Sequence, residues 1–355
     1  MSTPSVAVLW VGTYPTAGDA PGTGEGIWRV GVDPSGRFMS GVLAAPVTSP
    51  SFLALDPSRR TLLAVAETPS GGLTSFRVSD ARTLTRVSSA PSGGSDPCHV
   101  VVAGAAGWVA GYGDGVAAIV PLAGDGTLGT ARAFPHAGSG PVAGRQDAPH
   151  AHFVHVWGDR VLVCDLGTDE LRSYALDGTG SPGGEVAAVL PPGTGPRHLV
   201  ELPDGTILLV GELDCRLHVL RPAAPGGLEH VGSVAITERT MPDGSPGYPS
   251  HITVAGDLVH VGVRGPDVLS VLRVRVATGE RSGAVGHVAI ENVHDVDLGA
   301  GAWPRHHAVL ADGELVVVAA QNGDELVSVR LDRASGVGAV TDRLALPAPA
   351  CVLAA

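Results

Sequence analysis

The sequence predicts an all-β fold, a seven-bladed β-propeller of four-stranded antiparallel blades closed by the N- and C-terminal strands in one blade. Three observations predict it. Short apolar runs rich in β-branched residues alternate with Gly-, Pro- and Asp-rich turns along the whole chain. A proline that opens an apolar alternation recurs at intervals of 45 to 55 residues. The two ends of the chain also read as complementary parts of one repeat.

Residues 148–178 show the repeating unit most clearly. A first strand is expected after Pro149, and a Gly-Asp turn at 158–159 leads into a second strand at 161–164. Another turn precedes a third strand at 171–176, and a weaker fourth strand follows in each repeat. Four strands in about 50 residues fit a propeller blade better than a solenoid, whose ends would be polar caps.

The closure of the ring follows from the repeat markers and the chain ends. Residues 6–14 and 26–32 match the second and third strands of a unit that lacks its first, and residues 349–355 supply a lone first strand. Pairing the last strand with the first leaves no open sheet edge. We therefore expect residues 1–355 to form a single propeller domain. Its seven first strands are marked by Pro50, Pro97, Pro149, Pro196, Pro249, Pro304 and Pro349.

Two long inserts interrupt the regular spacing. Residues 136–148 precede the third marker and residues 236–248 precede the fifth. Both lead into the start of a first strand, so both are expected on the same rim of the ring. Loops of this kind on a rigid scaffold often cover a site. A simple linker is an equally good interpretation of the second insert.

Composition excludes several classes of function. The formal net charge of −12 argues against a nucleic-acid or anionic-membrane surface, since both need a basic patch. All 23 basic residues are Arg, and the absence of Lys rules out Schiff-base chemistry and a P-loop lysine. The four cysteines lie far apart in apolar runs, which favours buried reduced thiols.

The N-terminal residues form an apolar run without a basic flank or a small-residue cleavage site, so they read as a strand and not as a signal peptide. No apolar run approaches the length needed to span a bilayer. We expect a cytoplasmic protein, monomeric or weakly dimeric, with no membrane or nucleic-acid partner and no cofactor or metal.

Polar side chains recur at two positions of the repeat that should meet. The start of strand one and the end of strand two lie at the same edge of an antiparallel blade, and strand one lines the central channel. These positions in all blades should therefore ring one mouth of the channel. They are occupied by Phe52, His99, His150, His152, Arg197, His198, Ser250, His251, Arg305, His306 and Cys351 at strand-one starts, and by Tyr14, Glu67, Tyr112, Asp165, Glu212, Arg264 and Gln321 at strand-two ends.

Several of these residues also have a structural interpretation. The histidines that follow the marker prolines, among them His99, His198 and His251, can equally bond the backbone of a neighbouring blade. Asp165 is better explained as the cap of the turn that follows it. Arg197, Glu212 and Arg264 are harder to explain structurally, because charged groups beside a channel need partners or a ligand.

Several motifs resemble the lactonase-type seven-bladed propeller family, which includes propeller 6-phosphogluconolactonases and fungal carboxy-cis,cis-muconate cyclases. They are DPCHVVV at 96–102, RQDAPHAH at 145–152, GPRHLV at 195–200, GELD at 211–214, VRGPD at 263–267 and QNGDELVSVRLD at 321–332. The resemblance implies that the catalytic His, two arginines and acid correspond to His152, Arg197, Arg264 and Glu212. The expected substrate-binding residues at the same mouth are His150, His99, His198, His251, Arg305, Gln321 and Arg145.

The leading hypothesis is a lactone hydrolase acting on a sugar lactone, with His152 or Glu212 as base and arginines binding the oxyanion or an anionic substituent. The alternative is a cycloisomerase or lyase of the carboxymuconate cyclase type that uses the same groups. Two weaker alternatives are a non-enzymatic propeller that binds proteins through its other face and a metal-dependent lactonase. The expected partner is a small anionic lactone or carboxylate.

Overall fold

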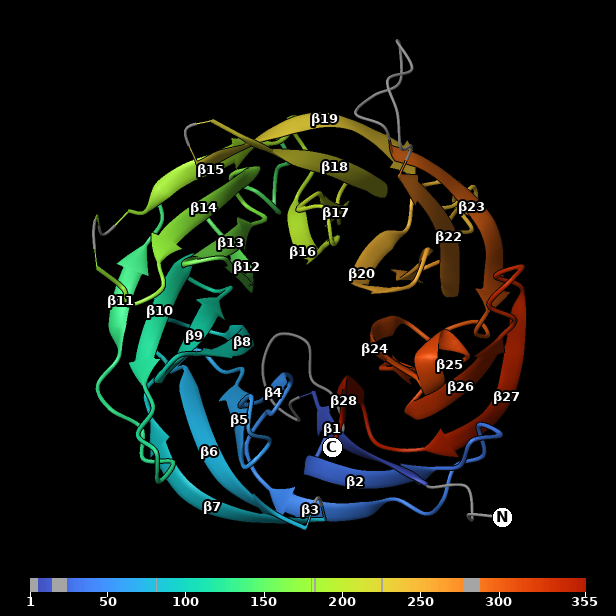
Figure 1. Cartoon of the computed structure of the whole chain (residues 1–355), viewed down its shortest axis with the longest axis horizontal. Coiled ribbons are helices and arrows are strands. Elements are labelled where there is room, and N and C mark those ends of the chain that lie inside the picture. Colours follow the sequence, from blue (N-terminus) through green and yellow to red (C-terminus); the bar gives the residue numbers. More distant parts are fainter. Residues whose placement is uncertain are drawn as a thin grey trace.

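The computed structural model describes residues 6–14, 24–80, 82–179, 181, 183–224, 226–276 and 288–355. Within them, β1 to β28 form seven four-stranded antiparallel sheets arranged in a ring (Figure 1). The described residues also contain a three-residue 3-10 turn, η1 (Ala311–Gly313), but no helix long and apolar enough to cross a membrane. The predicted all-β, seven-bladed propeller is confirmed.

The strands of each blade follow one another outward from the central axis, and we number the blades along the chain. Blade 1 contains β28 (Pro349–Ala354), β1 (Ala7–Thr13), β2 (Gly26–Val32) and β3 (Val42–Pro46). Blade 2 contains β4 (Leu53–Leu55), β5 (Thr61–Ala66), β6 (Gly72–Ser79) and β7 (Thr83–Ala90). Blade 3 contains β8 (Pro97–Ala103), β9 (Ala106–Gly111), β10 (Val116–Pro121) and β11 (Arg132–Pro135). Blade 4 contains β12 (Ala151–Trp157), β13 (Arg160–Asp165), β14 (Glu170–Ala175) and β15 (Glu185–Val189).

The remaining three blades repeat this order. Blade 5 contains β16 (Pro196–Glu201), β17 (Ile207–Gly211), β18 (Arg216–Ala223) and β19 (Gly227–Ala235). Blade 6 contains β20 (Tyr248–Ala255), β21 (Leu258–Arg264), β22 (Val268–Val276) and β23 (Val288–Asp297). Blade 7 contains β24 (Pro304–Leu310), β25 (Leu315–Ala320), β26 (Glu325–Leu331) and β27 (Gly338–Ala345).

The ring closes as the chain ends predict. The last strand, β28, pairs antiparallel with β1, with Leu9 opposite Ala354 and Val11 opposite Val352. The first strands of neighbouring blades contact one another all the way round the axis. Figure 1 shows the red C-terminal strand beside the blue N-terminal strands. The starts of all seven first strands therefore surround one central channel.

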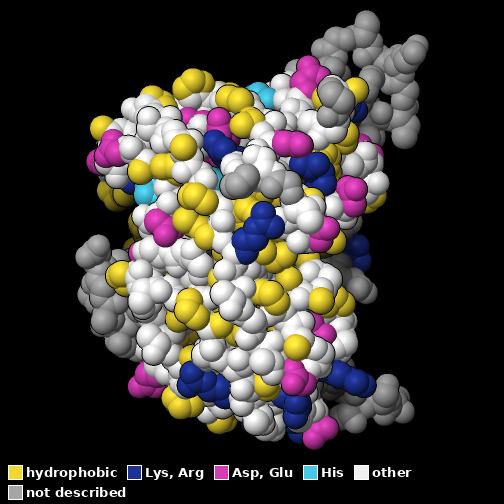
Figure 2. Space-filling view, turned by 90° about the vertical axis from the view of Figure 1, so that its left-hand side faces the viewer, with side chains coloured by type: hydrophobic (Ala, Val, Ile, Leu, Met, Phe, Trp, Pro, Cys, Tyr) yellow, Lys and Arg dark blue, Asp and Glu magenta, His cyan; other side chains and the backbone are white. Residues whose placement is uncertain are grey.

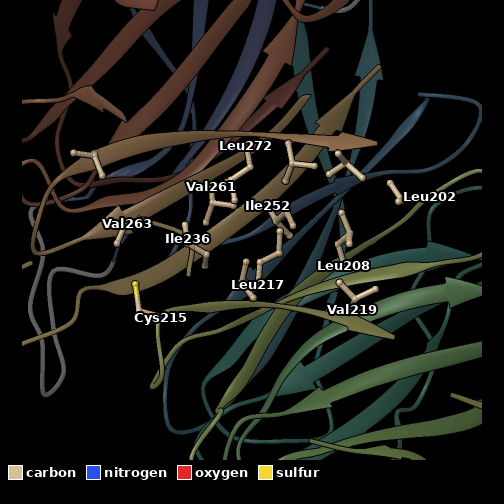
Figure 3. Close-up of a cluster of buried hydrophobic side chains, with 14 residues drawn as sticks. Leu202, Leu208, Cys215, Leu217, Val219, Ile236, Ile252, Val261, Val263 and Leu272 are labelled. Atoms are coloured by element: carbon tan, nitrogen blue, oxygen red, sulfur yellow. The ribbon is translucent and has the colours of Figure 1, made fainter. Parts of the chain in front are cut away.

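Apolar clusters lie between neighbouring blades and hold the ring together. Figure 3 shows one of them, in which Leu208 and Leu217 of blade 5 face Val261 and Leu272 of blade 6. Each of the seven blade-to-blade junctions has a buried cluster of this kind among the described residues. Burying a side chain of this size contributes about 1.5–3 kcal/mol. The apolar faces of the sheets thus fix the blades, and the polar strand ends are left for the mouth.

The four cysteines are buried and unpaired, as predicted. One first strand differs from the expectation: β4 begins at Leu53, three residues after its marker Pro50. Ser49 has a positive φ of 48°, and its carbonyl oxygen accepts hydrogen bonds from Ser51 N and Glu67 N. This local turn replaces the first ladder bonds of the strand.

Candidate active site

A β-bulge at the start of several first strands turns selected side chains toward the mouth. The strand pairing skips one residue at Cys98, His152, Arg197 and Arg305, between otherwise regular partners. A bulge bends a strand and re-aims the extra side chain, and bulges are common beside active sites. The repeat therefore presents a different functional group to the mouth from each of these blades.

Glu212 is the centre of the first cluster at the mouth. It follows the buried strand β17, and its carboxylate accepts hydrogen bonds from three guanidinium groups. Arg197 Nε lies 2.8 Å and Arg264 Nη2 lies 2.7 Å from Glu212 Oε2, and Arg145 Nη2 contacts Oε1. Three positive charges around one negative charge leave a surplus of two. We call these four residues the Glu212 cluster.

The positive charges of the surrounding arginines keep the Glu212 carboxylate ionised. Burial opposes ionisation of Glu212, but the charges of Arg264 and Arg197 outweigh it and hold the pKa of the carboxyl well below its usual range. Burial and the neighbouring Arg264 lower the pKa of Arg197. A carboxylate bound by three arginines is a poor base, because protonating it would break three charge-assisted hydrogen bonds.

Backbone carbonyl groups fix the two buried arginines of the Glu212 cluster. Arg197 Nη1 donates to Ser250 O, and Arg264 Nε donates to Tyr248 O at 3.0 Å. The Arg264 guanidinium also stacks over the Trp303 ring at 5.6 Å. Among the described residues, Arg197 Nη2 and Arg264 Nη1 have no hydrogen-bond partner, so they can donate to a ligand.

The first insert delivers Arg145 to this cluster. Its neighbour Gln146 is fully buried, and Gln146 Nε2 donates to Leu166 O and Asp169 Oδ1, both at 2.8 Å. These bonds anchor the insert on blade 4 and leave the Arg145 side chain about one-third exposed beside Glu212. The second insert packs against the turn after Arg264, because Met241 lies beside Gly265.

His150 and His152 lie at the start of blade 4, where they contact residues of blades 3 and 5. His150 Nδ1 lies 2.7 Å from Tyr112 O, and the His150 ring stacks on the Tyr112 ring at 4.5 Å. His152 lies closer to the axis, with its ring 5.6 Å from Tyr112 and 5.4 Å from His198. Burial and the Arg197 charge lower the pKa of His152 well below its usual range, so its imidazole is neutral.

The Asp165 carboxylate fixes the backbone of His150 by a hydrogen bond. Its Oδ1 accepts the backbone N–H of His150 at 2.9 Å and of Gly167 at 3.0 Å, and its Oδ2 lies 2.5 Å from His136 Nδ1. The bond to Gly167 confirms that Asp165 caps the following turn. The bond to His136 was not anticipated from the sequence.

A second cluster lies on the opposite half of the mouth, on blades 7, 1 and 2. Tyr14 Oη donates to Glu67 Oε1 at 2.8 Å, and Ser51 Oγ donates to Glu67 Oε2. Arg305 Nη2 lies 3.5 Å from Glu67 Oε1, and its Nη1 lies 3.4 Å from Gln321 Oε1. We call these residues the Arg305 cluster.

Imidazole rings fill the channel beside these clusters. His99, His198, His251 and His306 form a chain of ring contacts with Phe52, and His251 stacks on His306 at 3.8 Å. His99 Nδ1 accepts the backbone N–H of Val154 at 3.2 Å, which confirms the structural interpretation that it bonds a neighbouring blade. His198 Nδ1 instead lies 2.9 Å from His251 Nδ1. The binding roles of His99, His198 and His251 remain predictions.

The comparisons with known proteins agree with this architecture. A family described as "Lactonase, 7-bladed beta-propeller" matches residues 8–354. The chain belongs to this family. The structure of a periplasmic gluconolactonase from Pseudomonas aeruginosa superposes with a TM-score of 0.84 at 26% identity, covering 99% of both chains. A protein from Lactobacillus plantarum superposes with a TM-score of 0.81 at 26% identity, covering 99% of this chain and 100% of the other. A 6-phosphogluconolactonase from Formosa agariphila is 24% identical over 304 residues, covering 82% of this chain and 83% of the relative.

In this lactonase-family propeller four arginines meet at the mouth. On the flank of the ring shown in Figure 2, basic and acidic side chains are dispersed among polar and apolar ones. The mouth instead gathers Arg145, Arg197, Arg264 and Arg305. No group of three or more His, Cys, Asp and Glu residues that could hold a metal ion occurs within the described part of the chain.

Three residues of this lactonase-family site were missed from the sequence. Trp303 supports Arg264, His136 supports Asp165, and Ser51 donates to Glu67. Trp303 could have been found, because it directly precedes the marker Pro304 at the mouth. His136 carries no comparable signal, since it begins an irregular insert.

Proposed function

We propose that the protein hydrolyses the cyclic ester of a sugar lactone at the mouth of the channel. The observation that carries the proposal is the surplus of positive charge around Glu212 beside the neutral imidazole of His152. Lactone hydrolysis forms an oxyanion at the carbonyl carbon, and it needs a base to activate water. Both requirements can be met here. The gluconolactonase and 6-phosphogluconolactonase named among the relatives act on substrates of this class by their names.

In this mechanism Arg197 and Arg264 stabilise the oxyanion. Arg197 Nη2 and Arg264 Nη1 are the free donors, and Glu212 holds both guanidinium groups in place through hydrogen bonds of 2.8 and 2.7 Å. Donors that are already oriented toward the developing charge need no reorganisation during the reaction. We therefore assign Glu212 to positioning the arginines rather than to proton transfer.

We assign the base to His152. The charges of Arg197, Glu212 and Arg305 all act on its imidazole, which places it between the two clusters. The low pKa keeps a lone pair available, although it also makes the imidazole a weak base. An anionic substrate would offset the Arg197 charge and raise the pKa of His152 on binding. His152 would take a proton from water as the water oxygen bonds to the lactone carbonyl carbon. When the tetrahedral intermediate collapses and the ring C–O bond breaks, the same imidazolium would return that proton to the leaving oxygen.

The first prediction separates His152 from His150. We expect His152→Asn to lower kcat about 10²–10⁴-fold, the usual contribution of a general base. His150→Gln should lower kcat less than about tenfold, because the His150 ring stacks on Tyr112 and the variant keeps the backbone N–H that donates to Asp165. The measurement is turnover of gluconolactone and its 6-phosphate followed by proton release. If His150→Gln lost more kcat than His152→Asn, His150 and not His152 would be the general base.

A cycloisomerase would use the same side chains, with the arginines holding substrate carboxylates. The surplus positive charge at Glu212 suits that reaction as well. Adding a carboxymuconate and following its ultraviolet absorbance distinguishes the two functions. Hydrolysis of a lactone with unchanged muconate absorbance supports the proposal, whereas loss of absorbance without lactone hydrolysis contradicts it. The assays are repeated with a chelator to test metal dependence.

A further inference from the structure

Side chains at the β-bulges of several first strands bind the backbone of the next blade. Arg197 of blade 5 donates to Ser250 O in blade 6, and Ser250 Oγ donates to Pro304 O in blade 7 at 2.6 Å. Cys98, the bulge residue of β8, makes the same kind of contact with blade 4. Its Sγ lies 3.4 Å from His152 O. The thiol of blade 3 therefore reaches the strand that carries the proposed base.

The Cys98 contact falls on the bulge of β12. The register of β12 against β13 passes from Ala151 to Phe153, so His152 has no partner in it. Burial and the Glu67 charge raise the pKa of the Cys98 thiol, so it keeps its proton at neutral pH. A protonated thiol can donate, and His152 O at 3.4 Å is closer to Sγ than Ala151 O at 3.8 Å. The thiol thus holds the carbonyl group of the bulged residue.

The same sulfur atom faces the imidazole of His152. Sγ lies 3.8 Å from His152 Nδ1. When the thiol proton points to His152 O, the sulfur presents lone pairs to Nδ1, which suits a ring that carries its proton on Nδ1. The ring also contacts the residue's own carbonyl oxygen, which can only accept a hydrogen bond. Both contacts favour the Nδ1–H tautomer, in which the lone pair is on Nε2.

The aromatic rings beside His152 do not engage Nε2. The rings of Tyr112 and His198 are T-shaped to the His152 ring, with centroids 5.6 and 5.4 Å away. Within the residues that the structure describes, His152 Nε2 has no hydrogen-bond partner and is not enclosed. Nε2 is therefore the ring nitrogen that can accept a proton from a water molecule in the pocket.

We propose that Cys98 positions His152 for the reaction, by holding the bulge through His152 O and by keeping the ring in the tautomer whose lone pair is on Nε2. This inference rests on the proposed lactonase function and adds a positioning residue to it. Cys98 itself does not touch the reacting atoms. Proton transfer stays with His152, and the thiol acts only through its contacts with the carbonyl oxygen and Nδ1 of that residue.

The kinetics of Cys98→Ala and Cys98→Ser on gluconolactone and its 6-phosphate test this role. We expect Cys98→Ala to lower kcat about 3–10-fold, the effect of losing one neutral hydrogen bond, with KM within about twofold of wild type. Ala and Ser leave nearly the same cavity, but the Ser hydroxyl can still donate to His152 O. Cys98→Ser should therefore keep kcat within about threefold of wild type. Equal losses of kcat in the two variants would mean that Cys98 only fills space, and would overturn the inference.

Cys351 provides the matched control. It is also a buried free thiol near the start of a first strand, one position further from the bulge. It packs with Trp10 and Leu53 in the apolar cluster between blades 1 and 2, and its sulfur contacts the Leu53 backbone. Cys351→Ala and Cys351→Ser should both keep the wild-type kcat and KM. A loss of kcat in Cys351→Ala as large as that in Cys98→Ala would contradict a specific role for Cys98.

NMR of protein labelled with nitrogen-15 histidine determines the tautomer without any turnover. The His152 signals are those that disappear in His152→Asn. We expect wild type to show the Nδ1–H tautomer at pH 7.5 and Cys98→Ala to show a mixture with the Nε2–H form. Protonation on Nε2 in wild type, or an unchanged tautomer in Cys98→Ala, would refute the inference. If wild type hydrolyses neither lactone, the proposed function fails, and the NMR result still decides whether Cys98 sets the state of His152.

Discussion

Glu212→Gln is expected to lose about 3–5 kcal/mol of unfolding free energy, because removing one partner of a buried ion pair leaves the others uncompensated. Glu212 is 4% exposed and binds three guanidinium groups, two of which are themselves buried. The amide keeps the shape of the side chain but removes the negative charge. Arg197 and Arg264 would then repel each other without a counter-ion.

The same substitution should lower kcat/KM by about 10²-fold or more, because the arginines would no longer be held where the oxyanion forms. Urea unfolding measures the stability, and lactone turnover measures the activity. Arg145→Gln is the matched control: it removes one contact to the same carboxylate, but its side chain is 34% exposed. Because Arg145 is partly exposed and Glu212 keeps its bonds to Arg197 and Arg264, this variant should lose clearly less unfolding free energy than Glu212→Gln. If Glu212→Gln unfolded at the wild-type urea concentration, the carboxylate would not be the counter-ion of the cluster.

The location of this cluster could be predicted from the sequence because it follows from strand geometry. Antiparallel pairing brings the start of strand one and the end of strand two to one edge, as Pro196 opposite Gly211 shows. Ring closure then gathers those edges from all blades. This reasoning placed Arg197, Glu212 and Arg264 together, and the salt bridges confirm it.

The direction of individual side chains was not predictable in the same way. A strand alternates sides, so the neighbours Arg197 and His198 should point in opposite directions. The bulge between Pro196 and His198 interrupts that alternation, and the sequence carries no marker for it beyond the proline. The place of Arg145 depends on bonds from Gln146 to Leu166 and Asp169, which are long-range. The pairing of Tyr14 with Glu67 and Arg305 could have been anticipated, because blades 7, 1 and 2 are neighbours once the ring closes.

Mild acid should unfold the protein, because six histidines, five of them buried and His251 half-buried, are neutral in the folded state. Burial is the leading cause that lowers the pKa of all six, and the pKa of His306 falls to about 3. These histidines are His99, His152, His198, His251, His306 and His307. The geometry agrees for His99 and His306, whose Nδ1 atoms accept backbone N–H groups at 3.2 Å and so cannot carry a proton. The unfolded chain would bind a proton at each ring near pH 6.5.

Stability is therefore complete above about pH 6.5 and falls as the pH drops, because the unfolded state binds more protons than the folded state. Each histidine that stays neutral in the folded state lowers the free energy of unfolding by up to about 1.4 kcal/mol for every pH unit below 6.5. Because several rings share this penalty, the loss in mild acid is a large part of the stability of a typical domain, which is about 5–15 kcal/mol. Glu212 does not contribute here, because the stability from its lowered pKa is lost only below the usual carboxyl range.

Urea unfolding at pH 7.5, 6.5 and 5.5 measures this dependence, and its slope counts the protons taken up on unfolding. His306→Gln provides the comparison. The amide oxygen of Gln can still accept the backbone N–H of Val352 that His306 Nδ1 binds at 3.2 Å. The variant should reduce the slope below pH 6.5 by about one proton, whatever its stability at pH 7.5. An unfolding free energy that stays constant from pH 7.5 to 5.5 in wild type would mean that the imidazoles are charged in the fold, and the neutral His152 on which the proposed base depends would be lost with them.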